Sequence, residues 1–172
     1  MKIVLIGFMG CGKSTIGRLL ADRLGLEFLD LDARILQESG NDSINDIFKR
    51  GGESAFRQAE KQAAAALALA DDVVIASGGG SILDPENVRA FKDNSGLVIY
   101  LRIDFDTAVN RVQKSQDISQ RPLFKDLENA RILFEQRLAL YESCADLVID
   151  SSKSGPDVIA DEIERKLREI AS

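Results

Sequence analysis

The chain contains no histidine among its 172 residues. Histidine is the side chain that enzymes use most often as a general acid or base, so a carboxylate, a lysine or the substrate itself must take that role here. Cysteine is scarce as well, and Cys11 and Cys144 give no basis for a disulfide framework. Cys11 lies in a glycine-rich stretch, where we expect a small filler rather than a reactive thiol, because the sequence offers no partner base.

Long hydrophobic runs and an excess of positive charge are also missing. No window of eighteen apolar residues exists, which argues against a membrane span. The first residues enter an apolar run directly, without the pattern of a signal peptide. The net charge of −6 makes nucleic acid and anionic membranes poor partners. We therefore expect a cytoplasmic protein, with a processed organellar form left open, and a single domain over residues 1–172.

The segment Gly7–Thr15 fits the pattern G-x-x-x-x-G-K-[ST] of a phosphate-binding loop. An apolar run precedes it and apolar residues at helical spacing follow, which predicts strand, loop and helix. We expect Lys13 to reach the β- and γ-phosphates of a nucleoside triphosphate and Ser14 to hold Mg²⁺. The alternative is a glycine-rich turn with a surface lysine and no role in phosphate binding. The expected nucleotide contacts in this loop are Gly10, Cys11, Gly12, Lys13, Ser14 and Thr15.

Apolar runs alternate with helical patterns along the whole chain, which predicts a parallel sheet covered by helices on both faces. We expect a three-layer α/β/α fold around a five-stranded parallel sheet. The predicted strands are 3–6, 27–29, 73–76, 97–101 and 147–149. The predicted helical segments include 46–70, one starting at Asp84-Pro85, one ending near 110–112, then 126–143 and 156–170.

Two segments break the helical pattern. Gly51-Gly52-Glu53-Ser54 interrupts one helical region. Residues 114–125 are polar and contain Arg121-Pro122 between two predicted helices. Such a stretch is typical of a lid over a site, and equally of a plain surface connection.

Asp30 and Asp32 follow the second predicted strand. Ligands of parallel sheets bind beyond the carboxyl ends of the strands, and residues i and i+2 on a strand point the same way. Both carboxylates are therefore expected to face the phosphate loop. One would hold Mg²⁺, directly or through water, and the other would accept a hydrogen bond from an attacking hydroxyl. The alternative is that Asp32 caps a helix over 33–36.

Gly78, Gly79 and Gly80 follow the third predicted strand and permit close approach of the backbone to a ligand. The alternative is a flexible turn before Asp84-Pro85. Three arginines at positions 57, 121 and 137 carry the fork that suits carboxylates and phosphates. Spacing alone does not distinguish them from solvated surface cations.

Taken in order, these motifs resemble the shikimate kinase family along essentially the whole chain. The series runs from the phosphate loop to Asp30-x-Asp32. It continues with Gly51 to Arg57, which is similar to the family's G-E-x-x-F-R segment, and with the three glycines. It ends with Arg121-Pro122-Leu123 and with Arg137, which Tyr141 follows one turn later.

The resemblance implies a P-loop kinase fold and transfer of the γ-phosphate of ATP to the 3-hydroxyl of shikimate. It implies that Asp32 binds and orients or deprotonates the attacking hydroxyl, and that Asp30 acts on Mg²⁺ through water. It further implies three catalytic residues and an arginine that stacks on the adenine ring of ATP. A shikimate-binding region is expected at about residues 31–60, with further shikimate contacts from later residues. The implied residues are Lys13, Asp32 and Arg121 for catalysis, Arg111 and Arg121 for ATP, and Asp32, Arg57, Gly78, Gly79, Gly80 and Arg137 for shikimate.

We expect a lid at about residues 112–125 and Mg²⁺ as the cofactor. The expected binding partners are ATP and shikimate, and the protein is expected to be a monomer. A gluconate kinase or a nucleoside monophosphate kinase is the competing enzyme hypothesis, because both share the loop and lid. A catalytically silent nucleotide-binding module is the hypothesis from another class. A GTPase is disfavoured because the guanine-reading N-K-x-D is missing from the sequence.

Overall fold

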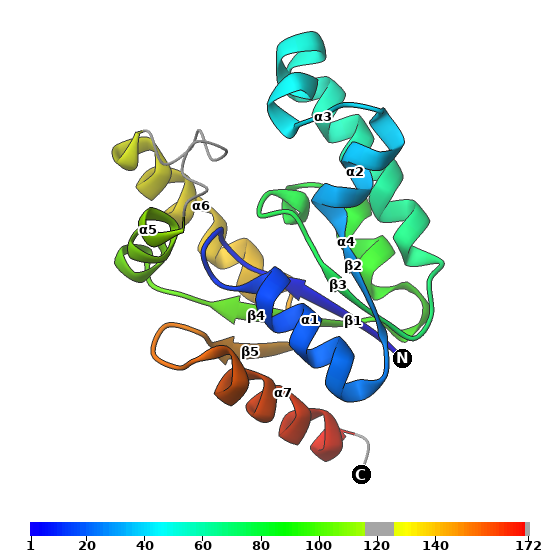
Figure 1. Cartoon of the computed structure of the whole chain (residues 1–172), viewed down its shortest axis with the longest axis vertical. Helices are drawn as coiled ribbons and strands as arrows, with labels where there is room; N and C mark the ends of the chain where they lie inside the picture. Colours follow the sequence, from blue (N-terminus) through cyan, green and yellow to red (C-terminus); the bar gives the residue numbers. More distant parts are fainter. Residues whose placement is uncertain (116–125, 171–172) are drawn as a thin grey trace.

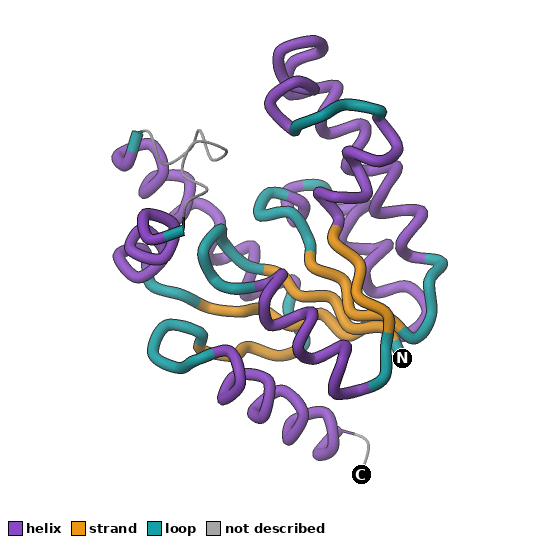
Figure 2. Tube along the Cα trace, viewed as in Figure 1, coloured by secondary structure: helices purple, strands orange, loops and turns teal. Residues whose placement is uncertain are grey.

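The computed structural model describes residues 1–115 and 126–170 as alternating strands and helices (Figure 1, Figure 2). The strands are β1 (Lys2–Ile6), β2 (Glu27–Asp30), β3 (Val73–Ala76), β4 (Leu97–Arg102) and β5 (Leu147–Asp150). The α-helices are α1 (Lys13–Leu24), α2 (Leu31–Ser39), α3 (Ile44–Ala68), α4 (Pro85–Lys92), α5 (Phe105–Lys114), α6 (Leu127–Cys144) and α7 (Pro156–Ile170). Two short 3₁₀ helices are η1 (Ser81–Leu83) and η2 (Asp93–Ser95).

The five strands form one parallel sheet in the order β2-β3-β1-β4-β5. Both the number of strands and their parallel direction confirm the predicted fold class. Every residue of β1 and of β3 is buried, which explains why these strands appear as continuous apolar runs rather than as alternating patterns. The phosphate loop follows the central strand β1, so it lies between the ends of β3 and β4.

Helices cover the two faces of the sheet unevenly. Figure 1 shows α1 and α7 side by side on the near face, with α4 and α6 behind the sheet. Arg23 of α1 donates to Asp157 and Asp161 of α7 over 2.9 and 2.6 Å, which ties the two near-face helices together. Helix α2 and the first part of α3 project beyond the sheet, and they carry most of the predicted shikimate-binding region.

Helix ends agree with the sequence signals where a short polar side chain precedes an apolar pattern. Asp84 caps α4 by accepting from the backbone N–H of Glu86, and Pro85 occupies the first helical position. Helix α3 contains the predicted interruption as a kink, because Gly52 has φ 69° and ψ −168° inside it. Only glycine adopts this conformation at little cost, so the kink is encoded by the residue type.

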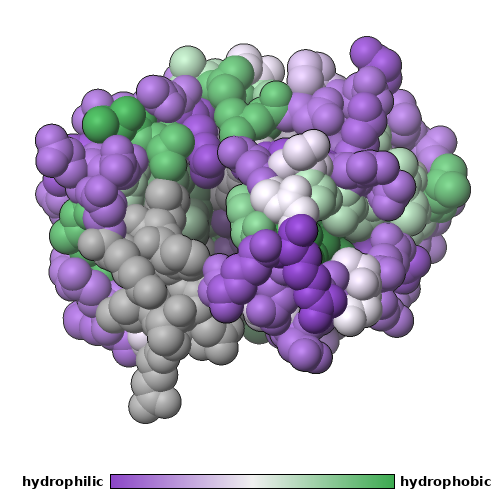
Figure 3. Space-filling model, turned by 90° about the horizontal axis from the view of Figure 1, so that it is seen from above, coloured by the Kyte–Doolittle hydropathy of each residue, from purple (hydrophilic) through white to green (hydrophobic). Residues whose placement is uncertain are grey.

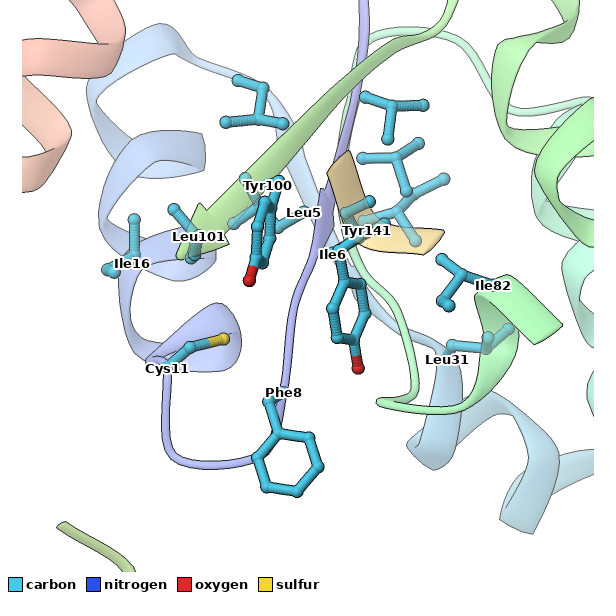
Figure 4. Packing of buried hydrophobic residues seen from close by; sticks show 14 of the residues in the cluster. Leu5, Ile6, Phe8, Cys11, Ile16, Leu31, Ile82, Tyr100, Leu101 and Tyr141 are labelled. Atoms are coloured by element: carbon cyan, nitrogen blue, oxygen red, sulfur yellow. The ribbon is translucent and has the colours of Figure 1, made fainter. Parts of the chain in front are cut away.

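The core lies on both faces of the sheet and reaches the end of the phosphate loop (Figure 4). Phe8 and Cys11 of that loop are both fully buried, so the loop is anchored by packing as well as by its backbone. The burial of Cys11 agrees with its predicted role as a filler. No helix within 1–115 and 126–170 is both long and apolar enough to cross a membrane.

Candidate active site

The phosphate loop connects β1 to α1 and takes its shape from three glycines. Gly7, Gly10 and Gly12 have φ values of 145°, 85° and 98°, all in the region that favours glycine. A Cβ at Gly10 would lie 2.8 Å from the carbonyl oxygen of Ala108, so the loop also packs closely on α5. The structure confirms the predicted order of strand, loop and helix, with Gly12 at the N-cap of α1.

Lys13 lies across this loop. Its Nζ donates to the carbonyl oxygens of Gly7 and Phe8 over 2.7 and 3.2 Å. The ammonium group is therefore held against the start of the loop, and the partial positive charge at the N-terminus of α1 adds to its own. A phosphate group placed against this loop would meet both charges. Ser14 and Thr15 follow in the first turn of α1 and are exposed.

Asp30 is placed by the end of β2 and faces α1. Its Oδ2 accepts from the Ser14 hydroxyl over 2.8 Å. Its Oδ1 accepts from the backbone N–H groups of Asp32 and Ala33 over 3.1 and 3.3 Å. Asp30 is thus the N-cap of α2, and the alternative that Asp32 caps this helix is wrong.

Asp32 belongs to the first turn of α2 and not to the strand. Asp30 and Asp32 are therefore not the neighbours on one face of a strand that the sequence predicted, because the strand ends at Asp30 and the helix begins one residue later. Helix geometry nevertheless turns Asp32 toward the glycine loop after β3. Its Oδ1 lies 3.1 Å from the position that a Cβ at Gly78 would occupy.

The three glycines after β3 differ in what surrounds them. A Cβ at Gly78 would meet Ser81 Oγ at 2.9 Å and Glu60 Oε1 at 3.0 Å, besides Asp32. A Cβ at Gly80 would meet the guanidinium of Arg57 at 2.9 Å. Gly79 has more room, with its nearest neighbours at 3.8 Å in the phosphate loop. A side chain at position 78 or 80 would therefore have to displace the polar ends of these site residues.

Arg57 reaches the glycine loop from α3 and is held by two carboxylates. Its Nη1 donates to Glu60 Oε2 over 2.6 Å, and its Nη2 donates to Glu53 Oε1 over 3.4 Å. Glu60 is 1% exposed and also accepts from the Ser81 hydroxyl over 2.7 Å. A buried carboxylate is tolerated when it is paired and hydrogen-bonded in this way. The pair fixes the guanidinium on one side of Gly80.

Arg137 approaches the same loop from α6. Its Nη1 donates to the carbonyl oxygen of Gly79 over 3.3 Å. The hydroxyl of Tyr141, one turn later, donates to the same oxygen. Two guanidinium groups from helices far apart in sequence therefore meet at two adjacent glycines.

Arg111 of α5 is directed away from these groups, toward the loop after β5. Its Nη2 donates to the carbonyl oxygen of Ser151 over 2.6 Å, and its Nη1 lies 3.4 Å from the carbonyl oxygen of Gly10. The same loop is shaped by Asp150, which accepts from the Ser152 N–H over 2.8 Å. That hydrogen bond lowers the pKa of Asp150 below its ordinary value of 3.8. Arg121 and most of the predicted lid lie outside the described residues.

The structure thus brings together the phosphate loop, Asp30, Asp32, the three glycines, Arg57 and Arg137 at the carboxyl ends of β1, β2 and β3. From above, hydrophilic residues cover most of the visible face of the described chain, and hydrophobic residues form separate patches (Figure 3). Sequence reasoning did not identify Glu60 or Ser81. The only available signal for Glu60 was its position three residues after Arg57, within ion-pairing distance on a helix.

Comparison with known proteins agrees with this arrangement. The family model described as shikimate kinase matches residues 9–168. The shikimate kinase of Lactococcus lactis subsp. cremoris (strain MG1363) is 41% identical over 166 residues, covering 96% of this chain and 98% of that protein. The shikimate kinase of Enterococcus faecalis (strain ATCC 700802 / V583) is 40% identical over 170 residues, covering 98% and 99%.

Solved structures give the same result. The shikimate kinase from Acinetobacter baumannii in complex with shikimate aligns with a TM-score of 0.88 and 32% identity, covering 98% of this chain and 93% of that chain. A deoxyadenosine kinase from M. mycoides aligns with a TM-score of 0.65 at 20% identity, which shows a shared fold only.

Proposed function

The chain belongs to the shikimate kinase family, and on that premise we propose how its residues transfer the γ-phosphate of ATP to the 3-hydroxyl of shikimate. The products are shikimate 3-phosphate and ADP. The family places the chain among the phosphotransferases. The observation that supports the acceptor site is the meeting of Arg57 and Arg137 at Gly80 and Gly79, because shikimate carries a single carboxylate that two guanidinium groups can hold.

ATP would bind with its phosphates in the loop at residues 10–15. Lys13 is already directed into the loop by the carbonyl oxygens of Gly7 and Phe8, so little reorganisation precedes its contact with the β- and γ-phosphates. Arg111 bridges the phosphate loop and the loop after β5, which suits a contact with the adenine ring. Stacking of a guanidinium on an aromatic ring supplies that kind of contact.

Ser14 and Asp30 fit Mg²⁺ as the required ion. Their oxygen atoms lie 2.8 Å apart, and Mg²⁺ prefers hard oxygen ligands while it keeps several waters. Within the described residues no group of three acidic, histidine or cysteine side chains could hold a metal, which fits an ion bound mainly by phosphates and water. When bound, Mg²⁺ neutralises charge on the transferred phosphate. Asp30 would act on it through water, and Ser14 directly.

Shikimate would lie between the glycine loop and α2. Arg57 and Arg137 would hold its carboxylate, with the backbone of residues 78–80 beside it. Asp32 would hold the ring hydroxyls and accept the proton of the attacking 3-hydroxyl. The hydroxyl oxygen then bonds to the γ-phosphorus as the bond to the β,γ-bridging oxygen breaks and ADP leaves. Alignment and charge neutralisation supply most of the rate in such a transfer.

Residues 1–172 form one kinase domain with a lid at about 112–125, from which Arg121 would neutralise the transferring phosphate. The protein would work as a monomer in the cytoplasm. Light scattering on the protein as it elutes from a size-exclusion column, with and without nucleotide, measures its molar mass and so tests whether it is a monomer.

A coupled assay of ADP release tests the activity. Folded protein with Mg-ATP and shikimate should turn over well above the rate without shikimate. Gluconate and nucleoside monophosphates are the competing acceptors, and neither should raise the rate by more than the background. Turnover with one of these and not with shikimate would overturn the proposed substrate, and nucleotide binding without turnover would favour the silent binding module.

A further inference from the structure

The carbonyl oxygen of Gly79 accepts hydrogen bonds from two side chains of α6. Arg137 donates over 3.3 Å, and the Tyr141 hydroxyl donates as well. Arg137 is partly exposed, whereas Tyr141 is fully buried. In the proposed function Arg137 has a second acceptor, the carboxylate of shikimate. The hydroxyl of Tyr141 keeps its hydrogen bond to the Gly79 carbonyl when shikimate binds.

Gly79 lies where the two halves of the site meet. The position of a Cβ on it would be 3.8 Å from both Gly7 O and Met9 N of the phosphate loop. A partly buried carbonyl oxygen that loses its donor carries a desolvation penalty. If Arg137 were its only donor, turning Arg137 toward a substrate would incur that penalty.

We propose that Tyr141 is a positioning residue that keeps the Gly79 carbonyl hydrogen-bonded and thereby frees Arg137 to bind the carboxylate of shikimate. The inference rests on the proposed function, because it assigns Arg137 to that carboxylate. It adds a role for a side chain that never touches the substrate. Tyr141 acts through Arg137.

The position of Tyr141 is set by the core. Its ring stacks on Tyr100 of β4 at a centroid distance of 5.1 Å and an interplanar angle of 18°. Figure 4 shows the two rings with their hydroxyls directed toward the end of the sheet that carries Phe8 and Cys11. Burial raises the pKa of Tyr141, so the phenol keeps its proton and remains a donor over the working pH range.

Tyr100 provides a matched control. Its ring is equally buried and belongs to the same stack, but its hydroxyl has no hydrogen-bond partner among the described residues. Tyr100→Phe and Tyr141→Phe therefore remove the same atom from the same kind of environment. They differ in the contacts of that atom, which in Tyr141 are with the carbonyl of Gly79 and with Arg137.

The experiment measures KM for shikimate, KM for ATP, kcat and the melting temperature of both variants. Tyr141→Phe should raise the shikimate KM about five- to tenfold, the size expected for one lost hydrogen bond at a partly buried acceptor. The ATP KM should change less than about twofold. Tyr100→Phe should leave both KM values unchanged. Equal rises in both KM values, or the same rise in both variants, would show a merely structural role and overturn the proposal.

Arg137→Ala completes a double-mutant cycle. It should raise the shikimate KM, and Tyr141→Phe should add less than about twofold in that background, because the residue through which it acts is gone. An Arg137→Ala variant with unchanged shikimate KM would overturn both the carboxylate assignment and this inference. A raised KM in Arg137→Ala with none in Tyr141→Phe would overturn this inference alone. Full persistence of the Tyr141→Phe effect in Arg137→Ala would also contradict it.

Discussion

The phosphate loop is formed by one continuous segment between β1 and α1, whereas the acceptor site takes side chains from α2, α3 and α6 around the backbone of the glycine loop. The loop depends on backbone conformation, with glycines at positive φ and a lysine held by main-chain oxygens. The acceptor site depends on side-chain pairs such as Arg57 with the buried Glu60. A site built from backbone serves any triphosphate, while a site built from side chains recognises one acceptor. Substitutions on the two sides should therefore have different signatures.

The largest effect is expected on the acceptor side, at Asp32. Asp32→Asn keeps the size of the side chain but removes the base, so kcat should fall by about 10²–10⁴. Binding of ATP, measured by titration calorimetry, should be nearly unchanged. Ala33→Ser, a neighbouring change on α2, serves as a control for disturbance of the helix. A fall of less than about twofold in Asp32→Asn would limit this residue to a structural role.

Lys13→Ala should impair phosphate transfer from ATP. Loss of a positioned cation at the transferred phosphate is expected to reduce kcat by about 10²–10³, with any acceptor. Because Lys13 donates only to two main-chain oxygens and, over 3.6 Å, to the sulfur of Cys11, the melting temperature should move little. Steady-state kinetics and thermal unfolding on the same sample check both parts. A large loss of stability with normal turnover in the folded fraction would contradict the assignment.

Arg57→Lys should sharpen the contrast, because it keeps the charge and removes the fork. An ammonium group cannot hold a carboxylate through two parallel hydrogen bonds, so the shikimate KM should rise about tenfold. The KM for ATP should stay within about twofold of the wild-type value. Arg50→Lys, an exposed arginine on the same helix, is the matched control. An unchanged shikimate KM would remove Arg57 from the acceptor site.

The smallest effect concerns the loop after β5, where Asp150 accepts from the backbone. Its pKa is lowered in the folded chain, so its stabilisation is complete above its ordinary value of 3.8 and is lost as pH falls through the lower folded value. Because the side chain is 48% exposed, we expect less than about 0.5 kcal/mol after screening. Urea unfolding of wild type and Asp150→Asn at pH 6 and below pH 4 measures the difference between them. The wild-type advantage should shrink at the lower pH, and an advantage that grows there would contradict the sign.

The sequence allows prediction of those parts of the structure that neighbouring residues determine. The phosphate loop, the five strands, the Asp84-Pro85 helix start and the kink at Gly52 all depend on nearby residues, and all are confirmed. The end of β2 was not predictable to one residue, so the alternative in which Asp32 caps the next helix placed the cap two residues after Asp30, which is the N-cap. The contacts of Glu60 with Ser81, and of Arg137 with Gly79, join residues far apart in the chain, and no local pattern encodes them.

The order of the strands has a consequence for synthesis on the ribosome. β1 is the first strand to be made, yet its two neighbours are β3 and β4, which pair with it through Val73 and Leu97 onward. At elongation rates of about 5–20 residues per second, several seconds therefore pass between synthesis of the phosphate loop and synthesis of the strands on either side of β1. The nascent chain displays a complete ATP motif long before it has a sheet to support it. We therefore expect the nascent chain to bind ATP only after β4 has been synthesised, and not as soon as the motif has emerged.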